Sequence, residues 1–247
     1  TECRFAAGML RILYRDGSLV AVDKPPGLLV HRTALSRAQD FALQRLRRQL
    51  GCRVYAIHRL DRPASGVLLF ALSRELAAAV SRLFQARSVN KRYLVVVRGH
   101  LNAEGVIDRP LRDEDGAVRR PALTRYRTLG LAELPVPVGP YPTSRYSLVE
   151  VSPLTGRYHQ IRRHFHHIAH PLIGDTTHGD GRHNRYFRQL LGSSRLLLHA
   201  HHMGLRHPQT GARLEIVAPL DSQWRSLMGS LGWGSTPVSS DQVPHGV

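Results

Sequence analysis

The sequence is short of cysteine and long hydrophobic runs, and each shortage excludes a class of protein. There are two cysteines in 247 residues, and neither lies in a Cys-x-x-Cys motif. This excludes a disulfide-stabilised scaffold and is typical of a reducing compartment. No stretch approaches the roughly 18 apolar residues that a transmembrane helix needs, and the first residues lack a signal-peptide pattern. We therefore expect a soluble, cytoplasmic protein with no membrane partner.

Several well-known catalytic and cofactor motifs are also missing. The sequence has no Walker loop, no GxGxxG fingerprint, no HExxH and no GxSxG. These absences remove the usual signatures of nucleotide, dinucleotide, zinc-protease and serine-hydrolase sites. Any chemistry must therefore come from another set of residues.

Acidic residues are few, so the net charge is strongly positive. The chain has 35 Lys and Arg against 18 Asp and Glu, a formal charge of +17, and all but two of the cations are arginine. Such a field attracts polyanions, and arginine can both pair with phosphate and stack on bases. RNA or DNA is therefore the first partner to consider, although an arginine-rich composition also arises from genomic bias.

Local patterns predict strands that alternate with helices. Two strands joined by an Asp-Gly turn lie within residues 10–31 and end in the Pro-Pro-Gly bend at 25–27. Ser36 is predicted to cap a helix that ends at Leu50 before Gly51, and Ser73 is predicted to cap a second helix. Further strands are expected at 67–72, 91–99, 121–129, 144–153, 195–200 and 213–219, and further helices at 158–169 and 221–231.

The order of these elements indicates the fold class. Helices and strands do not follow a regular βαβ spacing, so we expect an α+β fold with a mixed, mainly antiparallel sheet and flanking helices. Residues 101–121 are predicted to be a loop or a small insertion, and 133–143, which contain four prolines, an extended connection. Residues 1–232 are expected to form one catalytic domain of two closely fused lobes, and 233–247 a disordered tail.

One carboxylate stands among cations in HRLDRPASGVLL, residues 58–69. Asp61 lies between Arg59 and Arg62, just before an apolar run that predicts a buried strand. Neighbouring guanidinium groups favour the ionised acid. An ionised acid opposes phosphate binding but suits a nucleophile or a base. The alternative is a structural ion pair that organises the turn.

Two further stretches contain candidate site residues. Tyr93, early in a predicted strand, is either a core tyrosine or an aromatic shelf for a base. The segment LTGRYHQIRRHFHHIAH, residues 154–170, places His166 and His170 one helical turn apart. The arginines around these histidines oppose a divalent metal, so an RNA-facing surface is favoured and no metal site is predicted.

Taken together, these stretches resemble the RluA-type pseudouridine synthases. DKPPGLLVH, HRLDRPASGVLL, KRYLVVVRG, LTGRYHQIRRH, HPLIGD and LLLHA are each similar to a motif of that family. The two lysines, Lys24 and Lys91, both lie inside these motifs, which suggests that a compact ammonium is required there. The resemblance covers residues 10–220. It implies the pseudouridine synthase fold with a central RNA-binding cleft, a uridine isomerisation without cofactor or metal, and base flipping. We expect a monomer.

Finer similarity points to a tRNA substrate. PYPTSRYSLVEVSPLTGRYHQIRRH and HPLIGDTTHGDGRHNR resemble a group in this family that acts on the uridine at tRNA position 65, at the base of the T stem. Residues 101–121 are shorter than in that group. Large-subunit ribosomal RNA is the alternative substrate, and a non-catalytic RNA chaperone is the alternative function.

The resemblance implies a role for each matched residue. Asp61 is the catalytic aspartate, either as a nucleophile at C1′ or as a base at C2′, and Arg162 pairs with it. Arg59 enters the space left by the flipped uridine, and Tyr93 stacks on the uracil and can help to remove the C5 proton. The remaining predicted contacts to RNA or to the flipped base are Leu198, Arg157, His159 and Lys91.

Overall fold

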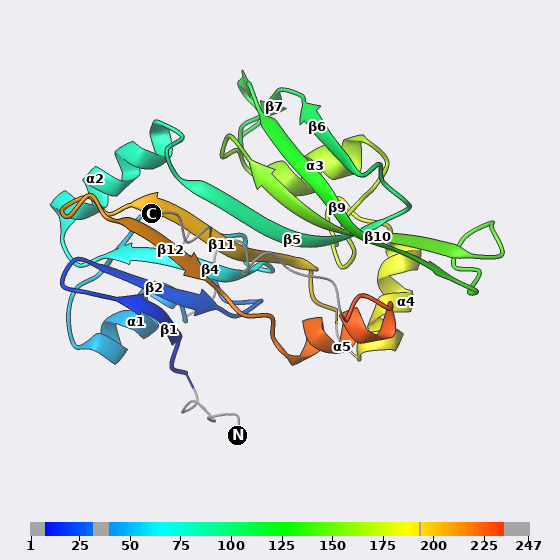
Figure 1. Ribbon diagram of the computed structural model, residues 1–247, viewed down its shortest axis with the longest axis horizontal. Helices are drawn as coiled ribbons and strands as arrows, with labels where there is room; N and C mark the ends of the chain where they lie inside the picture. Colours follow the sequence, from blue (N-terminus) through cyan, green and yellow to red (C-terminus); the bar gives the residue numbers. More distant parts are fainter. Residues whose placement is uncertain (1–7, 32–39, 193, 235–247) are drawn as a thin grey trace, which may run out of the picture. The chain divides into compact units, whose positions relative to one another are not determined.

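The computed structural model describes residues 8–31, 40–192 and 194–234, which form two compact units (Figure 1). Unit 1 runs to Arg92 and also includes Leu198–Pro219, whereas unit 2 comprises Tyr93–Leu197 and the chain from Leu220. Each unit is therefore assembled from two separate stretches of chain.

Unit 1 is a sheet covered by helices. Its strands are β1 (Arg11–Arg15), β2 (Leu19–Lys24), β3 (Tyr55–Ala56), β4 (Ser65–Ala71), β11 (Leu198–Arg206) and β12 (Arg213–Val217), and its helices are α1 (Ala42–Leu50) and α2 (Arg74–Gln85). The order is β1-β2-β4-β11, with β12 paired to β11 and β3 to β4. All pairs are antiparallel except β4–β11. Alternate residues of β2 and β4, among them Leu19, Ala21, Val67 and Leu69, pack with Val80 of α2 in the core.

Unit 2 contains a second antiparallel array. Strand β5 (Asn90–Arg98) begins within unit 1 and continues into unit 2, followed by β6 (Glu104–Asp108), β9 (Leu123–Leu134) and β10 (Ser144–Pro153). The order is β5-β10-β9-β6, and β7 (Leu111–Arg112) and β8 (Arg119–Arg120) form a separate hairpin. Helices α3 (Gln160–His167), α4 (Gly181–Leu191) and α5 (Ser222–Ser230) complete the unit. Trp224, Trp233, Tyr146 and Phe187 are the largest side chains of its core.

The predicted α+β class and most of the predicted helix ends are confirmed. The Ser73 hydroxyl accepts a hydrogen bond from Leu76 N at 3.2 Å, and Asp221 accepts one from Trp224 N at 3.0 Å. Gly51 ends α1 in the left-handed conformation, with φ 68°. Ser36 lies outside the described residues, and α1 begins at Ala42, later than predicted, with Phe41 in an extended conformation as its N-cap residue.

Of the two alternatives for 101–121, the loop is wrong, because β6, β7 and β8 lie there. Strand β6 is an edge strand of which only Ile107 is buried, so its sequence contains too few apolar residues for a strand pattern. Helix α4 was not predicted at all. Its signals are the cap Asp180, the buried pair His183 and Phe187 four residues apart, and Gly192 at its end.

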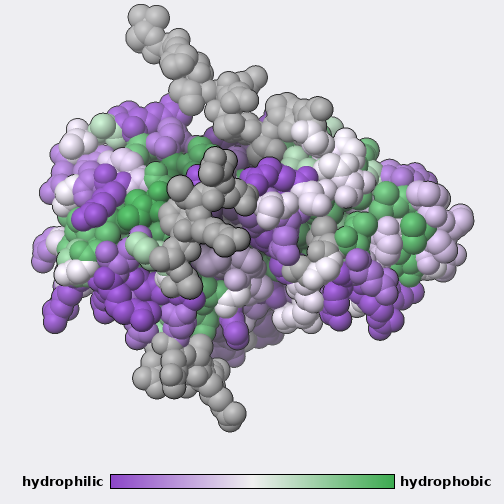
Figure 2. Space-filling view, turned by 90° about the horizontal axis from the view of Figure 1, so that it is seen from below, coloured by the Kyte–Doolittle hydropathy of each residue, from purple (hydrophilic) through white to green (hydrophobic). Residues whose placement is uncertain are grey.

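The last described residues belong to the core of unit 2. Trp233, at the start of the predicted tail, is only 2% exposed and packs in this core, while 235–247 lie outside the described residues. Within the described part of the chain, no helix is both long and apolar enough to cross a bilayer. Hydrophilic residues occupy much of the face seen in Figure 2, with smaller hydrophobic patches between them.

Candidate functional site

The turn that presents Asp61 lies between β3 and β4 in unit 1. The Asp61 carbonyl accepts a hydrogen bond from Ala64 N at 3.0 Å, and the residue is half-buried. The next residue, Arg62, binds the Pro-Pro-Gly bend through its main chain and its side chain. Gly27 N donates to Arg62 O at 2.8 Å, and Arg62 Nε donates to Gly27 O at 3.1 Å. The stretches DKPPGLLVH and HRLDRPASGVLL therefore hold each other in place.

Lys24 strengthens this junction from inside. Its side chain is fully buried, with 0% exposure. Its Nζ donates to Pro25 O at 2.9 Å, Leu28 O at 2.8 Å and Arg62 O at 3.2 Å. A buried charge is costly unless hydrogen bonds compensate it, and an ammonium has three donors for three such acceptors. A compact cation thus organises both loops around Asp61.

The Ser-Gly pair that follows fixes the start of β4. Ser65 Oγ and His199 Nδ1 lie 2.9 Å apart, and His199 Nε2 lies 3.2 Å from Ala218 O. Gly66 has φ +106°, and a Cβ there would meet Ala200 O at 2.2 Å. Only glycine fits this close parallel pairing of β4 with β11. Leu198, the first residue of β11, is 4% exposed.

Lys91 and His58 flank the ring of Phe84. The His58 and Phe84 rings stack with centroids 5.1 Å apart, and Lys91 Nζ lies 6.0 Å from the Phe84 centroid. Burial, together with the Lys91 charge, lowers the pKa of His58 to about 4. Burial also lowers the pKa of Lys91. A neutral His58 can accept the hydrogen bond from Leu69 N at 3.0 Å, which ties the start of HRLD to β4.

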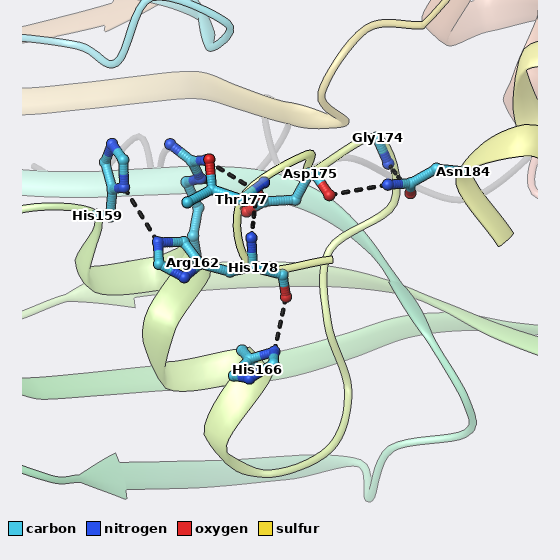
Figure 3. Close-up of polar contacts among 8 residues, drawn as sticks. All are labelled: His159, Arg162, His166, Gly174, Asp175, Thr177, His178 and Asn184. Atoms are coloured by element: carbon cyan, nitrogen blue, oxygen red, sulfur yellow. Dashed lines mark hydrogen bonds and ion pairs between the residues drawn. The ribbon is translucent and has the colours of Figure 1, made fainter. Parts of the chain in front are cut away.

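In unit 2, Arg162 on α3 forms a buried bidentate ion pair with Asp175 (Figure 3). Arg162 Nε donates to Asp175 Oδ2 at 2.7 Å, and Nη2 donates to Oδ1 at 2.8 Å. The two side chains are 4% and 0% exposed. Burial alone would raise the pKa of Asp175, but the hydrogen bonds and charge of Arg162 outweigh it and the pKa is lowered. The pair is therefore ionised.

The loop around Asp175 is fixed at several main-chain atoms. Asp175 Oδ1 also accepts hydrogen bonds from Thr177 N and His178 N, each at 2.9 Å. Asn184 of α4 accepts a hydrogen bond from Gly174 N at 2.7 Å and donates to Asp175 O at 2.8 Å (Figure 3). The carboxylate thus has partners on both of its oxygens and on the backbone that carries it.

His159 begins α3 in the left-handed conformation, with φ 50°. Its ring stacks on Tyr158, with centroids 3.8 Å apart, and its Nδ1 lies 3.1 Å from His178 Nε2. His166, one of the two histidines weighed as a metal ligand, has its Nδ1 2.7 Å from His178 O (Figure 3). Burial lowers the pKa of His178. The loop therefore contacts α3 at its beginning, its middle and its end.

The other predicted site residues have varied surroundings. Arg59 is exposed, whereas Tyr93 is half-buried on β5 opposite Val151 of β10. Arg157 donates through Nε to Pro121 O at 3.1 Å. Unit 1 contains Asp61, Arg59, Leu198 and Lys91, and unit 2 contains Tyr93, Arg157, His159 and Arg162. The pairing of Asp61 with Arg162 stays a prediction.

Asp175, the buried partner of Arg162, is not among the site residues that the sequence predicts. It follows the apolar stretch Pro171–Gly174 in a helix-rich, basic region. An arginine on the apolar face of a helix needs a buried acid, and this requirement could have identified Asp175. Among the described residues, no group of three or more His, Cys, Asp or Glu could hold a metal ion.

Comparison with known proteins adds to this geometry. Residues 18–167 match the family described as RNA pseudouridylate synthase. The chain is 45% identical to the tRNA pseudouridine synthase C of Vibrio cholerae, covering 91% of this chain and 97% of that protein. It is 48% identical to the protein of the same name from Pectobacterium carotovorum, covering 91% of this chain but only 63% of that protein. Among solved structures, the human protein RNA Pseudouridylate Synthase Domain Containing 4 matches with a TM-score of 0.71 and 25% identity, over 90% of this chain and 93% of that chain.

Proposed function

Because the chain belongs to the RNA pseudouridylate synthase family, we propose that it converts one uridine of tRNA to pseudouridine, at position 65. The relatives support a tRNA substrate, because they are named tRNA pseudouridine synthase C and match this chain over nearly their whole length in most cases. The net charge of +17 suits a structured RNA. A tRNA substrate also implies a cytoplasmic protein, and we expect it to act as a monomer.

The reaction is an isomerisation within one nucleotide. The N1–C1′ bond breaks, the uracil turns, a C5–C1′ bond forms, and the C5 proton leaves while N1 gains one. Asp61 either attacks C1′ as a nucleophile and leaves again when C5 bonds to C1′, or removes the C2′ proton as a base and returns it to C2′ when that bond forms. An ionised carboxylate is required in both routes. The observation that supports this role best is the junction of Lys24, Gly27 and Arg62, which fixes the turn presenting Asp61.

The other residues position the uridine and the carboxylate. Taking a paired base out of a helix costs a few kcal/mol, and the planar guanidinium of Arg59, which is exposed, is suited to stack in the vacated space. Tyr93 stacks on the flipped uracil, and Leu198 supports it from an apolar side. Arg162 pairs with Asp61, while Arg157, His159 and Lys91 contact RNA.

The decisive experiment substitutes the carboxylate. We expect Asp61→Asn to lower pseudouridine formation in unmodified tRNA by about 10⁴-fold or more, as losses of a catalytic nucleophile do, while tRNA affinity changes only a few fold. The control is Asp40→Asn, which removes a surface aspartate of unit 1 that pairs with Arg45. Retained turnover in Asp61→Asn would overturn the mechanism, and modification at a ribosomal RNA site alone would overturn the substrate.

A further inference from the structure

We propose that Asp175 is a positioning residue that sets the orientation of the Arg162 guanidinium for the reaction. This inference rests on the proposed function, because it concerns how Arg162 is made ready to pair with Asp61. It names a residue that does not itself touch the substrate.

The geometry of the ion pair fixes the orientation of the Arg162 guanidinium. The carboxylate binds the Nε and Nη2 side of the guanidinium, at 2.7 and 2.8 Å. A planar guanidinium held at two adjacent nitrogens cannot rotate about its last bonds. It has five N–H donors, and this contact uses two of them. The directions of the other N–H groups in the guanidinium plane are therefore fixed as well.

The burial of the ion pair protects this orientation from water. With side-chain exposures of 4% and 0%, water cannot compete for these hydrogen bonds. The two further hydrogen bonds to Asp175 Oδ1, from Thr177 N and His178 N, leave this oxygen little freedom to move. The carboxylate is a fixed reference point and not a flexible partner.

The loop that carries Asp175 is itself attached to both neighbouring helices. Asn184 of α4 holds the main chain at Gly174 and Asp175, and His178 contacts His159 and His166 of α3 (Figure 3). Gly174 has φ +80°, and a Cβ there would lie 1.9 Å from Arg195 O. Only glycine therefore fits this close-packed backbone, whose course places the Asp175 carboxylate next to Arg162.

The test compares Asp175→Asn with Asp180→Asn. Asp180 lies in the same loop, but it caps α4 at Arg182 N and pairs with Arg98 at 2.6 Å. We expect Asp175→Asn to lower the single-turnover rate about 100-fold, as a misplaced catalytic group does, with tRNA affinity changed only a few fold. Asp180→Asn should lower the denaturation midpoint and leave the single-turnover rate unchanged. A wild-type rate in a folded Asp175→Asn protein would overturn the proposal.

Chemical rescue provides a readout that a structural role would not move. In Arg162→Ala, sub-denaturing guanidinium chloride should raise the rate, because the Asp175 carboxylate can orient the free ion. The rescue should be absent in Arg162→Ala/Asp175→Asn and with equal concentrations of urea or sodium chloride. Equal rescue in both backgrounds would overturn the proposal. If Arg162→Ala does not fold, Asp175→Glu replaces it, and a wild-type rate with the carboxylate displaced by one methylene would also overturn the proposal.

A spectroscopic readout separates this inference from the proposed function. In protein with ¹⁵N-labelled arginine, the Nε–H of Arg162 should exchange slowly with water, and Asp175→Asn should abolish that protection. A wild-type protein that makes no pseudouridine would overturn the proposed function. The Nε–H signal would still decide whether Asp175 holds Arg162, and rapid exchange in the wild type would contradict it.

Discussion

The two units each contain a buried cation, and they hold it in different ways. In unit 1, Lys24 donates to the main-chain carbonyls of Pro25, Leu28 and Arg62. In unit 2, Arg162 is bound by the side chain of Asp175. Lys24 therefore fixes the backbone around it, whereas Arg162 is itself held in orientation by the Asp175 carboxylate.

This difference shows two ways of placing a catalytic group. The position of Asp61 depends on the path of the chain, because the junction next to it consists of hydrogen bonds to main-chain carbonyls. Arg162 depends on one partner side chain, because its orientation comes from a bidentate contact. The structural effect of a substitution should therefore extend over a loop in unit 1 and remain local in unit 2.

The largest expected effect is in unit 2. Arg162→Ala leaves the Asp175 carboxylate buried without its cation, which should cost about 3–5 kcal/mol in the free energy of unfolding. Arg162→Met combined with Asp175→Leu should recover most of that loss, because apolar side chains replace the whole pair. Chemical denaturation of the three proteins measures this. A double variant no more stable than Arg162→Ala would show that the contact is not the local unit described above.

In unit 1, Lys24→Met should cost about 3 kcal/mol or more, since each buried carbonyl that loses its donor costs about 1–3 kcal/mol. No second substitution at one position can restore this, because the carbonyls of Pro25, Leu28 and Arg62 all lose the Lys24 donor together. Denaturation measures the stability, and limited proteolysis measures opening near residues 25–28 and 62. Unchanged proteolysis would contradict the loop-wide effect.

Gly66→Ala should have the next largest effect, about 1–3 kcal/mol from backbone strain plus the clash with Ala200 O at 2.2 Å. Gly27→Ala is the matched control. It also has a positive φ, +83°, but nothing lies within 4 Å of its Cβ position. Its cost should be near 1 kcal/mol. Equal denaturation midpoints for the two variants would contradict the close approach of β4 to β11.

The smallest effect at neutral pH is a pH dependence in unit 1, because it emerges only on acidification. The pKa of His58 is lowered to about 4 in the folded protein, against about 6.5 in an unfolded chain. Between these values the unfolded chain binds the extra proton, so stability is full above pH 6.5 and falls as the pH drops toward 4. His58→Gln should flatten this part of the profile of denaturation midpoint against pH. An identical slope in both proteins would assign the loss to other groups.

Much of this organisation could be predicted from local sequence. The caps Ser73 and Asp221 and the terminator Gly51 act on residues within one turn, so their patterns are complete in a short window. The candidate status of Asp61 was likewise visible, because its arginine neighbours and the following apolar strand are adjacent in the chain.

Other features depend on residues that are distant in sequence. The partner of Arg162 lies 13 positions away across a loop, and no periodicity marks it. Strand β6 is defined by its pairing with β9 and not by its own apolar content. Helix α4 lacked a clear apolar stripe, since two buried residues, His183 and Phe187, anchor it among arginines.

The return of the chain from unit 2 to unit 1 has a consequence for synthesis on the ribosome. Strand β4 pairs with β11, so the sheet of unit 1 lacks a strand until residues 198–206 have been made. By then almost all of unit 2 has been translated. An apolar strand such as β4 is prone to aggregate while it lacks its neighbour. Nascent chains paused before residue 198 should therefore need chaperone protection. The two units should complete folding at nearly the same time.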